Sequence, residues 1–190
     1  MKKKILLIVG FLCIVAVANV YAIGVGVQGN LNIFTSMVHG SDDGEGGTTF
    51  APGFSLLFSP NHKFHVAGSW LRDNTAKQHV VGLTFDFVPM NLELFPRKKV
   101  LVKVRPDPFS IFFNVGLGVY TNTFFGNPDS DVPIQKITGG LRVPLGLSFF
   151  IDEKIEIFTH VAPSFGVDFQ PEFTFSDPFF PVALGLRFWF

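Results

Sequence analysis

The sequence predicts an all-β fold: a closed antiparallel eight-stranded up-and-down transmembrane β-barrel, preceded by a cleavable signal peptide. The 190-residue chain is rich in Phe and Gly, with 25 and 19 residues. Its apolar residues alternate with small or polar ones along segments of about ten residues, the span of a tilted membrane strand. After residue 22 no continuous apolar run is long enough for a membrane helix. A sheet within a membrane must close on itself, because its edges cannot be hydrated there.

Residues 1–22 have the pattern of a secretory signal peptide. Lys2–Lys4 precede an apolar run, and the segment ends in a small-residue cleavage site at Ala22. An uncleaved anchor helix is the alternative. Cys13 would suggest a lipoprotein, but the residues before it lack the usual leucine. We therefore assign 1–22 to a signal peptide and 23–190 to an outer-membrane barrel domain.

The predicted mature chain excludes two classes of protein. Cleavage removes the single cysteine, so no disulfide framework or thiol chemistry is available. It also removes three lysines, which leaves 12 basic against 15 acidic residues and a net charge of −3. A nucleic-acid-binding protein would need a basic face, so we predict no nucleic-acid partner.

The first four strands are predicted at 23–34, 50–58, 63–71 and 78–88. In each strand large apolar residues recur at every second position, the period of a β-strand. These positions are Val25, Val27, Leu31 and Ile33, then Phe54, Leu56 and Phe58, then Phe64, Val66 and Trp70, and finally Val81, Leu83, Phe85 and Phe87. Ser59–His62 has the composition of a tight turn between the second and third strands.

The stretch 89–108 leaves two alternatives open. Its apolar residues could extend the fourth and fifth strands into a hairpin, although Pro106 and Pro108 would interrupt the second arm. A short helix at 89–95 competes with this extension.

The last four strands are predicted at about 110–120, 134–149, 155–167 and 180–190. Their apolar positions include Ile111, Val115 and Val119, then Leu141, Leu145 and Phe149, then Ile155, Ile157 and Phe165, and finally Leu184, Leu186, Phe188 and Phe190. With eight strands, both ends of the barrel chain lie on one side of the membrane. The connections 36–49, 122–133 and 168–178 then face outside as net acidic loops, whereas 89–108 is unusually long for an inner connection.

The residues that alternate with these apolar positions would line the lumen. They include Gly, Ser and Asn residues together with five ionisable side chains: Asp86, Arg142, Glu156, His160 and Arg187. Eight strands leave an interior just wide enough for side chains, so we predict a structural network of ion pairs there. A polar channel and a ligand cup at the outer mouth are the alternatives. Trp70, Tyr120 and Trp189 are candidates for aromatic belts at the membrane surfaces.

The chain has two patterns that suggest enzymes but lack the required context. Gly24-Val25-Gly26-Val27-Gln28-Gly29 has the spacing of a dinucleotide-binding motif, but it lies inside a strand with no helix after it. His160 and Ser164 share a lumen face, yet four residues of strand separate them by roughly 13 Å. That distance is too long for a nucleophile and its base. We predict no catalytic residue.

The chain also lacks a recognisable metal or cofactor site. Asp42, Asp43 and Glu45 match no calcium loop, and the histidines show no zinc spacing. We therefore predict neither a metal nor a cofactor.

The signal peptide, the alternating strands and a last strand ending Arg187-Phe188-Trp189-Phe190 carry a family resemblance. The chain resembles small eight-stranded outer-membrane barrels of the OmpX, OmpA and OmpW kind, and also an uncharacterised spirochaetal outer-membrane barrel family. The resemblance implies a place in the bacterial outer membrane, contact with its lipid and assembly by the barrel assembly machinery. It also implies a C-terminal assembly signal, which would be carried by Leu184, Leu186, Phe188 and Phe190.

These observations favour a monomeric structural or surface-interaction protein that is not an enzyme. It would display its acidic loops to an external host or matrix protein, outside a lumen filled with side chains. Binding or passage of a small hydrophobic or lipid ligand through the barrel mouth, as in OmpW-like proteins, is the first alternative. A lipid-modifying barrel enzyme and a soluble lipocalin-like barrel are further alternatives.

Overall fold

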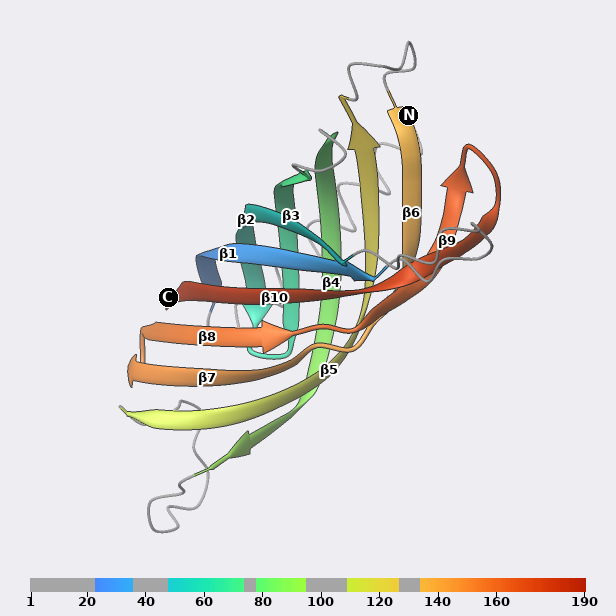
Figure 1. The fold of residues 1–190 in the computed structure, drawn as a ribbon. Coiled ribbons are helices and arrows are strands. Elements are labelled where there is room, and N and C mark those ends of the chain that lie inside the picture. Colours follow the sequence, from blue (N-terminus) through green and yellow to red (C-terminus); the bar gives the residue numbers. More distant parts are fainter. Residues whose placement is uncertain (1–22, 36–47, 74–77, 95–108, 127–133) are drawn as a thin grey trace, which may run out of the picture.

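The fold is shown in Figure 1 from a computed structural model, which describes residues 23–35, 48–73, 78–94, 109–126 and 134–190. The strands in these ranges are β1 (Gly24–Thr35), β2 (Thr48–Asn61), β3 (Phe64–Asp73), β4 (Gln78–Glu93), β5 (Ser110–Phe125), β6 (Ile134–Arg142), β7 (Leu145–Asp152), β8 (Ile155–Val161), β9 (Ser164–Gln170) and β10 (Thr174–Trp189). No helix in the same ranges is long and apolar enough to span a membrane. The predicted signal peptide lies outside the described residues.

The strands form one antiparallel ring of eight spans. β1 to β5 pair in sequence order, and β1 also pairs with β10 from Gly24↔Trp189 to Phe34↔Phe179. β6 and β7 both pair with β5 and together make one span. β8 and β9 both pair with β10 and make another, so that β10 lies between β1 and the β8–β9 span (Figure 1). The eight-stranded closed barrel predicted from the sequence is confirmed.

Two predicted strands are interrupted where the sequence suggested continuity. The segment 134–149 is divided into β6 and β7 at Pro144, and 155–167 is divided into β8 and β9 at Pro163. Proline has no N–H to donate to the ladder, although its carbonyl still accepts: the Gly116 N–H donates to the Pro144 oxygen over 2.9 Å. The register does not shift across either break. The alternation of side chains therefore continues through both prolines.

Strand boundaries differ from the prediction at two other places. β4 continues to Glu93, and Met90–Glu93 pairs with β5, so the helix considered for 89–95 is wrong. Most of 168–178, predicted as a loop, belongs to β9 and β10. A register irregularity between Ser176 and Phe179 accommodates Asp177 and Pro178 within β10. Residues 95–108 and most of the other two predicted outer loops lie outside the described ranges.

The large apolar side chains face outward, as the alternation predicts. Leu184 in β10 is 64 % exposed, while Ala183 and Arg187, which point to the opposite face of the same strand, are buried. The same contrast recurs around the ring, where Leu56, Leu83, Leu117 and Leu141 are also exposed. A soluble protein would reverse this arrangement, and a lipid-facing barrel requires it.

The barrel has two distinct ends. At the terminal end the backbones of Ile23 and Phe190 are hydrogen-bonded, and the tight turns at 62–63 and 153–154 lie there. At the opposite loop end, β1 ends and β2 begins. Near the loop end Ala51, Leu71 and Val80 form a buried apolar cluster against which Phe124 packs. On the terminal side of this cluster, the ring of Tyr120 meets that of Phe179 edge-on, with centroids 5.0 Å apart.

Candidate functional site

An ion pair joins β4 and β6 across the intervening strand β5 on the inner face of the barrel. Asp86 Oδ1 lies 3.2 Å from Arg142 Nε, although the two atoms are not aligned as a hydrogen bond. Asp86 on β4 and Arg142 on β6 are both register partners of Gly118, one on each side of β5. A Cβ at Gly118 would collide with the Asp86 carboxylate. Glycine at this position therefore leaves the space through which the carboxylate reaches the arginine.

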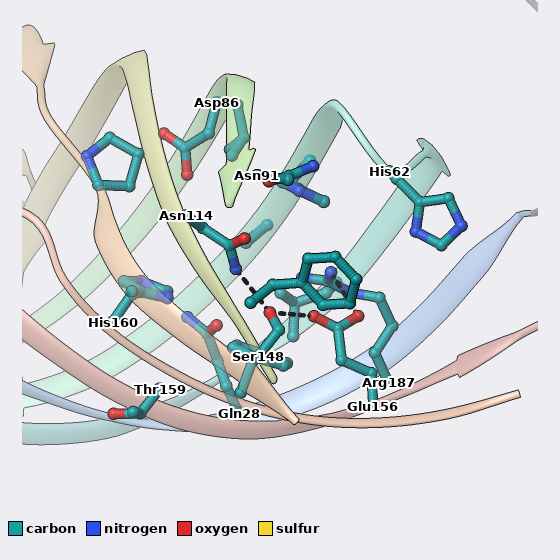
Figure 2. Close-up of a pocket in the computed structure, with 18 of the residues that line it drawn as sticks. Gln28, His62, Asp86, Asn91, Asn114, Ser148, Glu156, Thr159, His160 and Arg187 are labelled. Atoms are coloured by element: carbon teal, nitrogen blue, oxygen red, sulfur yellow. Dashed lines mark hydrogen bonds and ion pairs between the residues drawn. The ribbon is translucent and has the colours of Figure 1, made fainter. Parts of the chain in front are cut away.

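A second ion pair lies nearer the terminal end, between β8 and β10. Arg187 and Glu156 are direct cross-strand partners, and Arg187 Nη1 donates to Glu156 Oε2 over 3.0 Å. The same oxygen accepts from the Trp189 indole over 2.8 Å, and Ser148 Oγ donates to Glu156 Oε1 over 2.6 Å. Asn114 extends this network by donating to Ser148 (Figure 2). Both carboxylate oxygens are thus satisfied, which a buried charge requires.

Aromatic rings hold the Arg187 guanidinium in place. Its Cζ lies 4.6 Å from the ring centroid of Phe158 and 5.3 Å from that of Trp189. Cation–π attraction is strongest at such desolvated sites. Trp189 was a candidate for a membrane-surface belt, but it is buried inside the barrel, as is Tyr120. Trp189 comes directly after the outward-facing Phe188 and therefore belongs to the residues that face the lumen. The alternation alone indicates this orientation.

The two lumen histidine–serine combinations have different geometries. His160 Nε2 lies 3.4 Å from Arg142 Nη2, while Ser164 Oγ donates to the Ala162 carbonyl oxygen, so each side chain has a partner other than the one that a catalytic pair would require. His65 Nδ1 lies 2.7 Å from Ser59 Oγ, a pair that sequence reasoning missed. Ser59 is completely buried. A substrate therefore has no path to that hydroxyl.

A cavity of about 370 Å³ occupies the terminal half of the lumen (Figure 2). Each of the five ionisable residues predicted for the lumen lines it: Asp86, Arg142, Glu156, His160 and Arg187. A much smaller void of about 30 Å³ lies on the loop side of Arg142. The lumen is thus packed toward the loop end, but the prediction that side chains fill it throughout is wrong. An eight-stranded ring with Gly146 and Ala67 on its inner wall has too little side-chain volume to fill this half.

The cavity opens toward the terminal end of the barrel. Asn91 and Glu93 line it and are exposed, whereas deeper lining residues such as Gln28 and Glu156 are buried. His62, from the turn after β2, packs against Trp189 at this opening, with ring centroids 3.9 Å apart and the planes tilted by 33°. Burial lowers the pKa of His62; Glu156 opposes the shift and Arg187 adds to it. The neutral imidazole is therefore favoured at the opening.

Some buried polar atoms at the cavity have no hydrogen-bond partner among the described residues. They include Gln28 Oε1 and Arg187 Nε. The described residues contain no group of three or more His, Cys, Asp or Glu side chains arranged to hold a metal. The site can thus offer hydrogen bonds and aromatic contacts to a small molecule.

The residues of the suggested assembly signal lie on the outer face of β10. Leu184, Phe188 and Phe190 are exposed there, and Leu186 is half-buried. Recognition of these residues by the assembly machinery remains a prediction.

Solved structures with a similar fold are outer-membrane barrels. Neisserial surface protein A is 13 % identical, with a TM-score of 0.50 over 88 % of this chain and 97 % of that one. The N-terminal β-barrel domain of Pseudomonas aeruginosa OprF is also 13 % identical, with a TM-score of 0.49 and the same coverage. Ail, the attachment invasion locus protein of Yersinia pestis, is 14 % identical, with a TM-score of 0.44 over 89 % of this chain and 97 % of that one.

At such identities the likeness to Neisserial surface protein A shows the fold alone: a small β-barrel of eight strands. Neither a protein-family model nor a curated protein sequence matches the chain.

Proposed function

We propose that this chain is a bacterial outer-membrane barrel of structural or surface-interaction type that conducts no ions. The observation that carries the proposal is the combination of an apolar exterior with a lumen packed at the loop end. The exterior supports insertion in lipid, because exposed leucines such as Leu83 and Leu184 surround the ring. Outer-membrane barrels keep their termini and short turns on the periplasmic side. The terminal end would then face the periplasm and the loop end the outside.

Two layers of side chains oppose passage of ions. Leu71 and Val80 are almost completely buried near the loop end, and Phe124 packs against them. Deeper in the lumen, the Asp86–Arg142 pair crosses between β4 and β6. The apolar packing near the loop end and the ion pair deeper in the lumen would each narrow a path for ions.

Conductance across planar lipid bilayers tests this proposal. The purified chain is expected to insert without giving discrete current steps at 1 M salt, while an open porin in the same lipid gives them. Insertion itself is checked by protease protection of the reconstituted chain. Stable, ohmic openings of the inserted chain would show that the lumen conducts and would overturn the proposal.

The surface-interaction role rests on the predicted acidic loops. The segments 36–47 and 127–133 contain Asp42, Asp43, Glu45, Asp129 and Asp131. We propose that they contact an external host or matrix protein. Cells displaying the chain are expected to bind immobilised matrix proteins, and replacement of both segments by Gly-Ser linkers of equal length is expected to abolish binding. Unchanged binding by the replaced chain would remove this role and leave a structural one.

The two other candidate functions have less support. A ligand cup at the outer mouth would need space where Leu71, Val80 and Phe124 pack. A lipid-modifying enzyme would need an accessible nucleophile, but the hydroxyls of Ser59 and Ser164 are buried and bonded to other groups. A non-enzymatic function therefore fits the described geometry better.

A further inference from the structure

We propose that the cavity in the terminal half of the barrel binds a small, uncharged molecule that combines an aromatic or apolar ring with an amide-like group. The ligand would enter from the terminal end, opposite the mouth considered from the sequence. This inference goes beyond the structural and surface role and needs only that the barrel be closed.

The size and lining of the cavity suit such a molecule. A volume of about 370 Å³ is within the range of small-molecule sites in proteins. Phe112 and Phe150 form one aromatic wall, with ring centroids 5.7 Å apart and nearly perpendicular planes. Trp189 and Phe158 also line the cavity, next to Arg187. These four side chains give the cavity the apolar surface that a flat ring needs.

Unpartnered polar atoms indicate what the ligand must supply. Gln28 is 8 % exposed, and its Oε1 accepts no hydrogen bond from the described residues, although its Nε2 donates to Asn30 over 2.6 Å. Arg187 is 5 % exposed, and its Nε donates to no described residue. Leaving such buried groups unsatisfied is costly. An amide offers one donor and one acceptor and could satisfy both kinds of atom.

The charge of the lining selects against anions. Arg142 is compensated by Asp86 and Arg187 by Glu156, so neither arginine has a free charge for an anionic ligand. Glu93 adds a carboxylate at the opening, with no ion-pair partner among the described residues. An anion bound in the cavity would therefore find no uncompensated cation and would stay costly to bury, whereas an uncharged molecule would not.

Trp189 provides a direct optical test. The full chain has two tryptophans, and Trp70 lies on the outer face, so the Trp70→Phe variant leaves Trp189 as the reporter inside the cavity. N-acetylphenylalanine amide is the neutral probe, and N-acetylphenylalanine is the matched anion. The amide is expected to change Trp189 emission saturably, and the anion is expected to bind at least about tenfold more weakly. Equal affinities would overturn the inference.

Adjacent positions on β3 give a matched pair of blocking variants. Ala67 lines the cavity, whereas a side chain at Gly68 would meet nothing within 4 Å. In the Trp70→Phe background, Ala67→Phe is expected to abolish binding and Gly68→Phe to leave it unchanged. Equal loss in both variants, or equal retention, would contradict the proposed location.

Gln28→Leu keeps the test decisive if Ala67→Phe fails to fold. This variant removes the unpartnered acceptor and is expected to weaken amide binding about tenfold while the barrel still folds. Unchanged affinity would overturn the assignment of Gln28. If the chain inserts and remains closed to ions but shows no saturable amide binding, the cavity holds only water. The inference then fails while the proposed function stands.

Discussion

The Glu156 carboxylate connects β7, β8 and β10 by hydrogen bonds inside the lumen. It accepts hydrogen bonds from Ser148 of β7 and from Arg187 and Trp189 of β10. Residue types and alternation place Glu156 and Arg187 in the lumen, but they do not specify their partners. Ser148 and Trp189 became recognisable as members of the network only once neighbouring strands were in register.

Removing the charge of Glu156 should destabilise the barrel strongly. Glu156→Gln leaves the Arg187 guanidinium buried without its counter-ion, and we expect the free energy of unfolding to fall by about 3–5 kcal/mol. Urea titration in lipid vesicles measures this change. Lys136→Gln is the matched control: it breaks an ion pair with Asp168 at 2.8 Å, but Lys136 is 38 % exposed. Its cost should stay below about 1 kcal/mol. Similar losses for both variants would show that the inner pair is not special.

The stability of the barrel should depend on pH through His62. Burial against Trp189 lowers the pKa of His62 below its ordinary value near 6.5, so the unfolded chain binds the proton more readily. The free energy of unfolding keeps its full contribution from neutral His62 above about pH 6.5. This contribution is lost as the pH falls through that value toward the lower pKa of His62 in the folded chain. The slope contributed by this residue is at most about 1.4 kcal/mol per pH unit.

Unfolding free energies of the wild type and His62→Gln between pH 7.5 and 5.5 isolate this contribution from other titrating groups. The variant should show a shallower decline. Parallel curves would mean that His62 titrates with the same pKa in both states.

At the scale of the elements, close contact between β6 and β9 depends on glycine. Gly140 pairs with Gly166, and a Cβ at Gly140 would collide with the Phe165 carbonyl oxygen and the Gly166 Cα. Gly140→Val is expected to destabilise the barrel by about 1–3 kcal/mol or more, because backbone atoms cannot move aside as side chains do. Gly68→Val should be tolerated, since its side chain enters open space. Gel mobility of folded and unfolded forms in detergent measures the yield, and equal yields for both variants would contradict this account.

The elements also show where pattern reading reaches its limit. Alternation located all eight spans, since their large apolar side chains must face one way. It did not reveal the interruptions at Pro144 and Pro163, because the register runs through them unchanged. It also suggested a loop over 168–178, where the irregularity between Ser176 and Phe179 lets the strand continue.

For the whole molecule, the main prediction concerns contact with lipid. Leu184 and Phe175 both project outward from β10, but Leu184 lies in the ring between Gly29 and Thr159, whereas Phe175, 92 % exposed, lies near the loop end. Leu184→Arg should cost about 2–4 kcal/mol and Phe175→Arg about 0–1 kcal/mol, since a charge is most costly at the membrane midplane. Chemical unfolding in lipid vesicles checks this. Equal, small costs at both positions would place the exterior in water.

The sequence by itself determined which side chains of every span share a face, because a period of two leaves only two sets. Strand length, the signal peptide and the terminal aromatic strand favoured the outward direction for the Leu, Val and Phe set, and hence the fold class. Only the tertiary structure decided that Asp86 reaches Arg142 across Gly118, that Trp189 joins Glu156 within the lumen, and that a cavity lies beside them. These relations depend on register and ring closure between distant segments, and on the volume left between facing side chains, neither of which is encoded by any single strand.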